Sequence, residues 1–416
     1  GPRPTLQTLL PPDQTLTTRI EALSMAPTLF TSELVDTADH HPELRAAVSG
    51  VAGQFGRKYF QDVVARDDKP TELWDALAEA GFLGVHIPEN YGGGGGGLAD
   101  YNIVIEETAA QGCPVLSLVI GSITAPIITA HGSEAMKDTW LPGIASGKLR
   151  MSFAITEPDA GTNTHNISTK AVPNGDGWLL NGTKYYTSGV DEADSILVVA
   201  QSGEPDASGR HRLSLFVVDA DAPGITCQDI PCAVQAAEKQ FTVFFDDVEM
   251  GPEALIGTEG NGLRQVFAGL NPERVAASAI NNGISRFALE AAAQYANDRV
   301  VWSKPIGGHQ GIAHPLAEAY IQVQQARLMA ARAADLYDRG SEDAGEIANM
   351  AKFAAADSSL VALDRAIQTH GGNGLALEYG LADLWFVARL HKTAPVSREM
   401  ILNFVAQHSL GLPKSY

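Results

Sequence analysis

Apolar positions in the first third of the chain recur with the spacing of an α-helix. Leu44, Val48 and Val51 fall at i, i+4 and i+7, which places their side chains on one helical face. Similar runs follow, and glycine and proline residues separate them. The pattern predicts a helical region over residues 41–147.

Short β-rich runs replace this pattern from about residue 149 to residue 257. The four clearest runs cover residues 177–182, 195–200, 213–218 and 241–245. Each is bounded by Asn, Asp, Gly or Pro, the residues that end strands. The segment Asn174–Gly177 is a strong hairpin signal, because Asn, Asp and Gly tolerate the left-handed backbone of tight turns. A β-domain is therefore expected.

Helical periodicity returns after Gly262 and continues to the end of the chain. Four Ala-rich amphipathic helices are expected at residues 263–299, 315–339, 345–369 and 396–410. No internal repeat of about 20–50 residues interrupts this order. The sequence thus predicts helices, then a β-domain, then a four-helix bundle, which is an α+β protein.

The amino-acid composition limits which classes of partner the chain can bind. The chain has 416 residues and a net charge of −20, which argues against a nucleic-acid or anionic-membrane partner because both need a basic surface. No stretch has the length and apolar character of a membrane span.

The three cysteines show no ligand spacing, so reduced thiols and a cytoplasmic location are expected. His309, His314 and His370 are not paired with Asp or Glu, so no metal site is predicted.

The first residues are given no functional weight. Gly1-Pro2 resembles the remnant of a protease-cleavage site, and Met25 is the expected natural start. We expect residues 1–33 to be an extension.

Two glycine clusters are candidates for a phosphate or cofactor site. Gly92–Gly97 satisfies G-x-G-x-x-G, but no strand precedes it, so we interpret it as an inter-helix loop. Gly371–Gly374 follows a predicted helix. It is either a helix C-cap or a place where the backbone approaches a cofactor.

Two segments of the β-domain carry candidate binding groups. Residues 153–162 form a strand followed by a turn that offers hydroxyls and backbone N–H groups, either as a plain turn or to a polar heterocycle. Tyr185 and Tyr186 stand beside Thr187 and Ser188. Adjacent tyrosines in a β-domain favour packing over a ring-stacking site.

The helix that begins near Gly262 holds the most informative anomaly. The apolar stripe over Leu263–Leu270 continues onto a face that also carries Glu273 and Arg274. A carboxylate on a buried face has a raised pKa unless it is paired, as a general base for a weak carbon acid requires. The alternative is a charged pair that a kink at Pro272 turns aside.

Ordered motifs along the chain resemble those of the acyl-CoA dehydrogenase flavoprotein family, from about Pro42 to Tyr416. They are Pro88-Glu-Asn-Tyr-Gly92, Ile155-Thr-Glu-Pro-Asp-Ala-Gly161, Asn181-Gly-Thr-Lys184, Phe244-Phe-Asp-Asp-Val248, Ile256-Gly-Thr-Glu-Gly-Asn-Gly262, Arg299-x-x-Trp302-Ser303 with Gln310, and Gln368-Thr-His-Gly-Gly-Asn-Gly374. The resemblance implies an N-terminal all-α domain at 34–148, a middle β-barrel-like domain at 149–257 and a C-terminal four-helix bundle at 258–416.

The resemblance also implies an FAD enzyme that removes the α-proton and the β-hydride of an acyl-CoA or carrier-bound acyl thioester, with flavin N5 as hydride acceptor. The positions that match flavin-contacting residues are Phe153, Ile155, Thr156, Thr162, Tyr186, Thr187, Ser188, Thr393 and Pro395. Those that match residues binding FAD across a subunit interface are Arg299, Trp302, Gln310, Gln368 and Gly372. A homodimer or homotetramer follows from the resemblance, with a flavoprotein or O₂ as electron acceptor.

The chain departs from the family pattern at the catalytic base. Many members carry the base late in the chain, where this sequence has His391. Members similar to isovaleryl- and long-chain acyl-CoA dehydrogenases instead carry it in a motif that matches Leu270-Asn-Pro-Glu-Arg274. We therefore predict Glu273 as the base, with the His391 imidazole and Glu399 as lesser alternatives. A backbone N–H, as expected at His391, is the kind of donor that stabilises a thioester oxyanion.

Thr162, Arg274 and His391 are the predicted substrate-binding residues, by the same resemblance. Pro395 lies where relatives often have Glu or Gln near the FAD, and proline offers neither an N–H nor a polar side chain.

Two other functions stay open from the sequence. One is a flavin monooxygenase or oxidative decarboxylase of the same fold, acting on a biosynthetic intermediate. This alternative is compatible with the altered segment from His391 to Pro395 and with the adjacent tyrosines. The other is a non-catalytic partner subunit of a hetero-oligomer.

Overall fold

The computed structural model describes residue 30 and residues 42–203, 205 and 211–414. The expectations for Gly1-Pro2 and Met25 lie outside this part of the chain. Phe30, within the expected extension, is buried, and its ring lies 4.9 Å from that of Tyr320 between centroids.

Helices make up the N-terminal region, as the apolar periodicity predicts. They are α2 (Pro42–Ala52), α3 (Gly56–Ala65), α4 (Thr71–Glu79), α5 (Leu98–Ala110), α6 (Leu116–His131) and α7 (Glu134–Ala145), with short 3₁₀ turns η3 (Phe82–Gly84) and η4 (Glu89–Tyr91). α5 is buried on all its faces, and both α5 and α6 pack against the first long helix of the C-terminal region. These two helices therefore connect the N-terminal region to the rest of the molecule.

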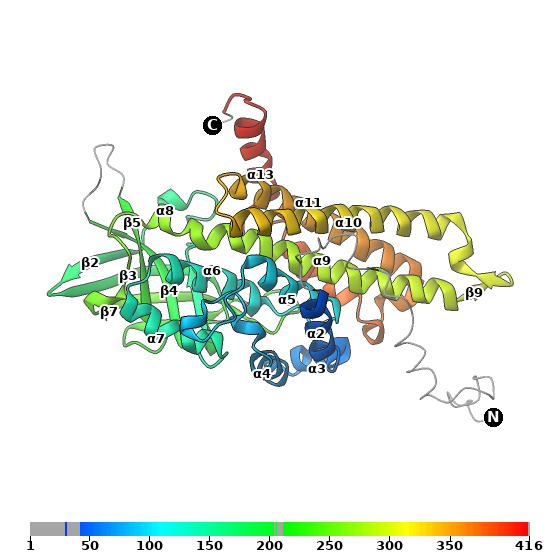
Figure 1. Ribbon diagram of the computed structural model, residues 1–416, viewed down its shortest axis with the longest axis horizontal. Coiled ribbons are helices and arrows are strands. Elements are labelled where there is room, and N and C mark those ends of the chain that lie inside the picture. Colours follow the sequence, from blue (N-terminus) through cyan, green and yellow to red (C-terminus); the bar gives the residue numbers. More distant parts are fainter. Residues whose placement is uncertain (1–29, 31–41, 204, 206–210, 415–416) are drawn as a thin grey trace.

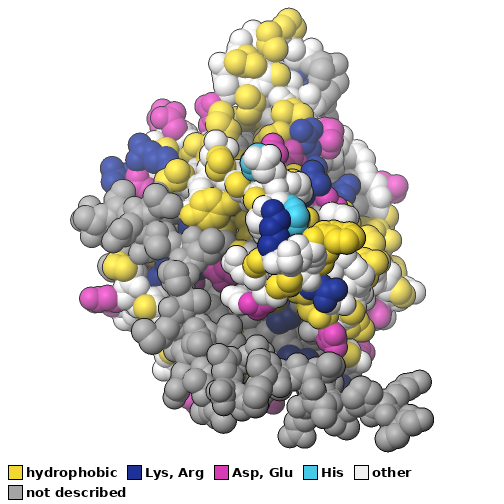
Figure 2. Space-filling view, turned by 90° about the vertical axis from the view of Figure 1, so that its right-hand side faces the viewer, with side chains coloured by type: hydrophobic (Ala, Val, Ile, Leu, Met, Phe, Trp, Pro, Cys, Tyr) yellow, Lys and Arg dark blue, Asp and Glu magenta, His cyan; other side chains and the backbone are white. Residues whose placement is uncertain are grey.

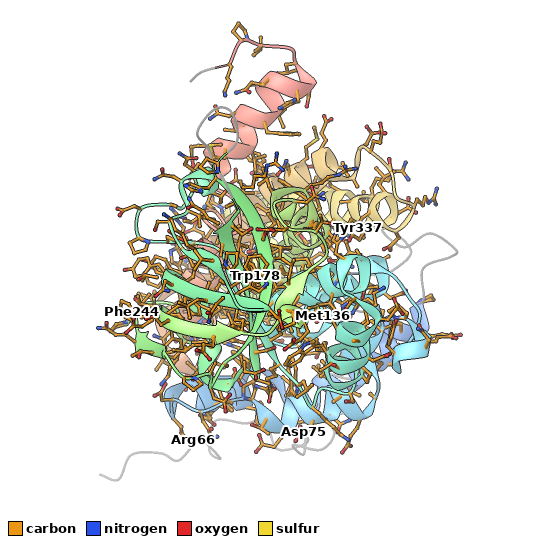
Figure 3. All side chains as sticks on the ribbon, turned by 90° about the vertical axis from the view of Figure 1, so that its left-hand side faces the viewer. Arg66, Asp75, Met136, Trp178, Phe244 and Tyr337 are labelled. Carbon is orange, nitrogen blue, oxygen red and sulfur yellow. The ribbon has the colours of Figure 1, made fainter. Side chains whose placement is uncertain are left out.

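An eight-stranded sheet follows. Its strands are β1 (Met151–Ala154), β2 (Lys170–Asn174), β3 (Gly177–Ser188), β4 (Ser195–Ser202), β5 (Arg212–Asp219), β6 (Ile225–Asp229), β7 (Gln240–Met250) and β8 (Leu255–Ile256). The order is β6-β7-β3-β2-β4-β5-β8, and β1 pairs parallel to β4. The predicted hairpin is confirmed, because Asn174 pairs with Gly177 and Gly175 has a φ of +61°. Figure 3 looks onto this end of the molecule, with Trp178 of β3 in the sheet.

The C-terminal region is helical and contains three long helices side by side (Figure 1). Its elements are α8 (Gly262–Gln265), α9 (Phe267–Asp298), β9 (Val300–Val301), β10 (Lys304–Pro305), η8 (Ile306–Gly308), α10 (Gln310–Asp338), α11 (Ala344–His370), η9 (Gly371–Leu375), η10 (Leu377–Tyr379), η11 (Ala382–Leu384), α12 (Trp385–Leu390), α13 (Arg398–Phe404) and the π-turn η12 (Val405–Ser409). The predicted α+β class with a helical C-terminal region is confirmed.

The last predicted helix lies close to its expected bounds of 396–410. α13 begins at Arg398, where the Ser397 hydroxyl caps its first turn by accepting from Met400 N at 3.3 Å, and it continues into η12 up to Ser409. α13 projects away from the bundle, and the periodicity did not predict the six-residue α12. Helices of this length carry too few apolar positions for a periodic signal.

A buried ionic cluster fastens α5 to the bundle. Glu106 accepts from Arg286 at 2.9 Å and from Arg327 at 2.7 Å, and Glu107 accepts from Arg45 at 2.5 Å. These carboxylates and guanidiniums compensate one another, as buried charges must. The contact is close because a glycine faces α5: a Cβ at Gly283 of α9 would lie 2.4 Å from the Glu106 carbonyl oxygen.

Candidate active site

The two predicted flavin-contacting segments of the β-domain lie side by side. One follows the end of β1 and the other ends β3. The backbone N–H of Tyr185 donates to the Thr156 carbonyl at 2.8 Å, and the Ser152 hydroxyl donates to the Ser188 carbonyl at 2.9 Å. Residues thirty positions apart in the sequence thus form one surface.

A buried ion pair supports this surface from within the sheet. Lys184 Nζ donates to the Ile155 carbonyl at 2.9 Å and to Glu157 Oε1 at 2.8 Å, and the lysine side chain is fully buried. Burial lowers the pKa of Lys184 to about 8, against the opposing effect of Glu157. Burial would raise the pKa of Glu157, but Lys184 and hydrogen bonds from Ser168 and Thr169 lower it to about 2. Both groups are therefore charged near neutral pH.

The exposed face of this surface suits a planar heterocycle. Tyr186 has a φ of +57° and is 52% exposed, so it is not a core residue as the packing interpretation implied. Its ring lies 4.3 Å from that of Tyr185. The buried hydroxyl of Thr187 has no hydrogen-bond partner among the described residues. An exposed aromatic ring at the end of a strand offers a flat surface on which a flavin ring can stack.

Other predicted residues border the same face. Phe153, Ile155 and Thr156 are partly exposed, Thr162 is exposed, and the Ser188 hydroxyl donates to Gln240 Oε1 at 2.9 Å.

Glu273 lies near the N-terminal end of α9 and is half-buried. α9 runs unbroken through Pro272, so the proline does not turn the charged pair away. Burial raises the pKa of Glu273 to about 7, against the opposing effects of Arg274 and Lys352. A half-buried carboxylate with a desolvation-raised pKa can take up a proton near neutral pH, and its immediate surroundings are called the recess.

Arg274 is anchored beside this carboxylate. Its Nη1 donates to Asn271 Oδ1 at 2.9 Å, and its guanidinium lies 5.7 Å from the Phe267 ring centroid.

Two further titratable groups meet at the recess. His391 is buried, and burial together with the charge of Lys352 lowers its pKa to about 3, so the imidazole is neutral. Lys352 of α11 is 1% exposed, and burial lowers its pKa to about 8. Lys352 was not among the predicted site residues. Its only signal in the sequence is an isolated lysine between Ala351 and Phe353 of an Ala-rich helix.

One hydrophobic cluster joins the recess to the flavin-contacting segments. Phe153 and Ile155 pack against the same buried cluster as Leu270, and Val266 is part of it. Leu270 precedes Glu273 by less than one helical turn. The structure therefore brings the predicted base and the predicted flavin face to one region of the molecule.

The loop after α12 carries the remaining predicted residues of this region. Thr393 is exposed, and its hydroxyl lies 3.3 Å from Arg389 Nη1. Pro395 is half-buried and precedes Val396, whose carbonyl accepts from Lys352 Nζ at 2.5 Å.

Three predicted FAD-binding residues lie at the opposite end of the bundle. Arg299 caps the C-terminal end of α9, Trp302 is 86% exposed, and Gln310 is the first residue of α10. Arg299 follows Glu273 by 26 residues on one continuous helix, which is about 39 Å along its axis. A single chain does not bring these residues to its own Glu273.

Gln368 and Gly372 lie near that same end. The neighbouring His370 stacks on Tyr295 of α9, with 4.2 Å between ring centroids. Gly371 is the C-cap residue of α11, with a φ of +61° and a ψ of −134°, a conformation that favours glycine. A Cβ at Gly371 or Gly372 would meet no described atom within 4 Å, so this backbone is open to an outside group.

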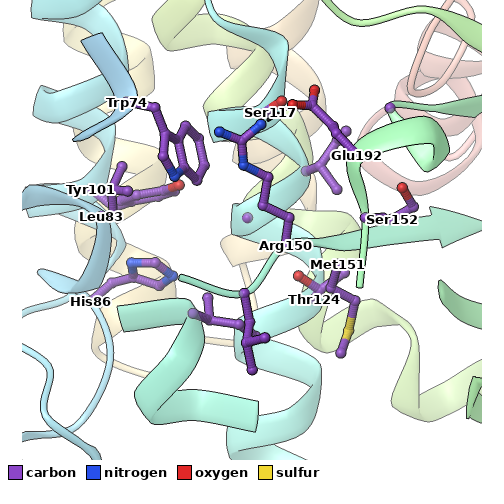
Figure 4. A pocket seen from close by; sticks show the side chains of 16 residues that line it. Trp74, Leu83, His86, Tyr101, Ser117, Thr124, Arg150, Met151, Ser152 and Glu192 are labelled. Carbon is purple, nitrogen blue, oxygen red and sulfur yellow. Dashed lines mark hydrogen bonds and ion pairs between the residues drawn. The ribbon is translucent and has the colours of Figure 1, made fainter. Parts of the chain in front are cut away.

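A separate cleft lies between the N-terminal helices and the sheet (Figure 4). Arg150 lies 4.4 Å from the Trp74 ring centroid there, and the His86 ring lies 3.9 Å from that of Tyr101 between centroids. Ser152 and Gly189 in its lining are chain neighbours of the flavin-contacting segments. None of the predicted site residues lines this cleft, and we assign no ligand to it.

Comparison with known proteins agrees with this geometry. Family models described as the N-terminal, middle and C-terminal domains of acyl-CoA dehydrogenase match residues 38–148, 152–248 and 260–410. The chain is 48% identical over 381 residues to acyl-CoA dehydrogenase FadE12 from Mycobacterium tuberculosis, covering 91% of this chain and 98% of that protein.

Solved structures show the same fold. A glutaryl-coenzyme A dehydrogenase in complex with glutaryl-CoA has a TM-score of 0.85 and 30% identity, covering 94% of this chain and 98% of that one. A glutaryl-CoA dehydrogenase from Mycobacterium smegmatis in complex with FADH2 has a TM-score of 0.83 at 24% identity, covering 93% and 97%.

A helical region, a sheet and a helical bundle, each matching one domain model of the acyl-CoA dehydrogenases, place the chain among the α+β oxidoreductases. The chain belongs to the acyl-CoA dehydrogenase family. No helix in the described ranges combines the length and apolarity needed to cross a membrane.

Proposed function

We propose that this chain catalyses the FAD-dependent α,β-dehydrogenation of an acyl thioester, with Glu273 as the base that removes the α-proton. The observation that carries the proposal is the recessed carboxylate of Glu273 beside a hydrophobic cluster shared with the flavin-contacting segments. Solved structures of this fold include FAD and FADH2 complexes, and the exposed ring of Tyr186 suits the same cofactor.

Each group of the recess has a distinct role in this proposal. Glu273, with a pKa near 7, is ionised in a substantial fraction of molecules at neutral pH and accepts the proton from the carbon next to the thioester. The neutral His391 adds no charge to the pocket, and its backbone N–H remains the proposed donor to the thioester oxygen. FAD, when bound, supplies the two-electron acceptor for the β-hydride.

Substrate binding is proposed for Thr162, Arg274 and His391, with an acyl-CoA or an acyl-carrier thioester as substrate. The electron acceptor is proposed to be a flavoprotein or O₂. A cytoplasmic location remains a prediction from the cysteines, of which Cys113 is buried and Cys227 and Cys232 are exposed free thiols.

An anaerobic screen of acyl-CoAs tests the proposed function. The purified yellow protein is expected to lose its visible flavin absorbance when mixed with its substrate, because no acceptor is present to reoxidise the flavin. The screen runs from short to long and from straight to branched acyl chains, with free CoA as the control. A protein purified without FAD would instead support a non-catalytic partner subunit. Rapid reoxidation by O₂ with an oxygenated product would support the monooxygenase alternative.

The FAD site is proposed to be shared between two copies of the chain, which makes the active form a homodimer or homotetramer. Arg299 lies about 39 Å along α9 from Glu273, and Trp302 and Gln310 follow it in the chain, so we infer that they serve a second copy's site. Apolar side chains are exposed at this end of the bundle, which Figure 2 faces, and Val300, Trp302 and Leu375 are among the exposed apolar residues. Such a surface is typical of one that a partner covers.

Arg299→Ala is expected to weaken FAD binding by about 10- to 100-fold, the range for losing a hydrogen bond from a charged group. The Kd is measured by flavin fluorescence, together with the flavin-to-protein ratio after gel filtration. Arg339→Ala is the matched control, because Arg339 is an exposed arginine just beyond the other end of α10, paired with Asp335 at 2.7 Å. Equal FAD affinity in the two variants would contradict the shared site.

A further inference from the structure

A lysine is buried in the bundle next to the proposed base. Lys352 lies on α11 with its side chain enclosed, and the helix positions around it are the small residues Ala348, Ala351 and Ala355. Burying an ammonium group is costly unless it is hydrogen-bonded and faces compensating charge. The buried ammonium group of Lys352 therefore needs a hydrogen-bond acceptor and a compensating negative charge, and the structure provides both.

The first partner is the backbone of the loop at residues 391–397. Lys352 Nζ donates to the Val396 carbonyl at 2.5 Å, across 44 residues of sequence. A second connection between this loop and α11 lies at a more exposed position, where Asp357 accepts from Lys392 at 2.7 Å and from Arg398 at 3.1 Å. Lys352 is the inner of the two connections, and it holds the loop that carries His391 and Thr393.

The second partner is the charge of the proposed base. Val275 of α9 packs in one buried cluster with Ala348 and Ala351 of α11, which brings the neighbouring Glu273 and Arg274 close to the helix segment that carries Lys352. Asp357 of α11 itself and Glu399 of α13 are the other charged groups that act on Lys352. Burial and Arg274 lower the pKa of Lys352, the three carboxylates raise it, and the result of about 8 leaves most molecules charged at pH 7.

Arg274 and Lys352 are the two cations that lower the pKa of Glu273. His391 is neutral because burial and Lys352 lower its pKa to about 3. Arg274 is charged at every working pH. The ammonium of Lys352 is thus the cation on α11 that stabilises the ionised form of Glu273.

We infer that Lys352 is a positioning residue of the active site: its ammonium holds the 391–397 loop against α11 and keeps the Glu273 carboxylate ionised for proton abstraction. The inference rests on the proposed function for its second part, whereas its first part concerns the loop alone. It assigns Lys352 no contact with substrate or cofactor.

Lys352→Met tests both parts, because methionine fills the same space without the charge. The acid limb of kcat/KM reports the pKa of the base in the free enzyme, and in the wild type it is expected near pH 7. Glu273 must be ionised to act, so loss of the nearby cation raises its pKa and moves this limb upward by about one pH unit. The Lys392→Met variant removes a cation of the same loop that pairs with Asp357, and it is expected to leave the limb in place.

Hydrogen exchange of the holoenzyme reports the local stability of the loop, and this readout does not depend on turnover. The amides of Lys392, Thr393 and Arg398 are hydrogen-bonded within or beside the loop, and in Lys352→Met they are expected to exchange about tenfold faster. Lys352→Arg keeps the charge and a donor, so both readouts are expected to stay close to wild type.

Three results would overturn the inference: unchanged exchange in Lys352→Met, an acid limb that does not move in that variant, or a limb that moves equally in Lys352→Arg. If Lys352→Met does not fold, Lys352→Arg alone tests the inference, and a shifted acid limb or faster exchange in that variant would overturn it. Should the wild type oxidise no thioester, the proposed function fails while the exchange comparison still tests the loop.

Discussion

Glu273→Gln is expected to yield a yellow, folded protein that has lost about 10⁴-fold in kcat/KM. Glutamine has the shape of glutamate and no proton affinity in this range, so the substitution removes the base and little else; loss of a general base costs up to about 10⁴-fold. Because Glu273 is partly accessible and has a raised pKa, its neutral replacement is not expected to destabilise the fold. The measurement is anaerobic flavin bleaching with the substrate found in the screen, together with the FAD content of the purified variant.

Two controls accompany this variant. Glu399→Gln removes an exposed carboxylate of α13 and is expected to retain activity, which would exclude the alternative base of the last helix. His391→Asn tests the imidazole, and a pKa near 3 predicts that it takes no part in proton removal near neutral pH. Bleaching at the wild-type rate in Glu273→Gln would refute the assignment of the base.

Lys184→Met is expected to lower the free energy of unfolding by about 3–5 kcal/mol, the cost of removing one partner of a buried ion pair. Without the lysine, Glu157 remains buried and charged, and the Ile155 carbonyl loses its donor. Since Ile155 borders the proposed flavin face, FAD retention should fall as well. Urea unfolding followed by intrinsic fluorescence measures the loss.

The double variant Lys184→Met/Glu157→Gln is expected to be more stable than Lys184→Met alone, because the unpaired buried charge is gone. Lys170→Met is the matched control, a lysine of the same sheet with an exposed side chain, and it should stay within about 0.5 kcal/mol of wild type. A double variant that is no more stable than Lys184→Met would show that the unpaired charge of Glu157 does not cause the loss of stability.

Local patterns of the sequence predicted most of the fold. The strands follow from runs of β-branched and aromatic residues between turn residues, and the hairpin at Gly175 follows from backbone chemistry that acts within four residues. The anomaly at Glu273 was also visible, because a helical stripe is a local property. The short α12 was not predicted, since it depends on contacts rather than on periodicity.

Lys352 shows why part of the site was not predictable. A lysine on an Ala-rich amphipathic helix normally faces water. Here a loop that lies about 40 residues later covers it and supplies the Val396 carbonyl. Whether such a lysine is exposed or buried is settled only by that long-range contact.

The sequence by itself determined the order of helical and β regions, the family and the identity of the predicted base, because propensity, periodicity and motifs act over short stretches of chain. The tertiary structure decided which groups share one environment. It placed Lys352 near Glu273 and His391 near Lys352, where burial shifts their pKa values, and it carried Arg299 to the far end of an unbroken α9. Desolvation and Coulomb interactions depend on distance in space, and a linear sequence does not contain that distance.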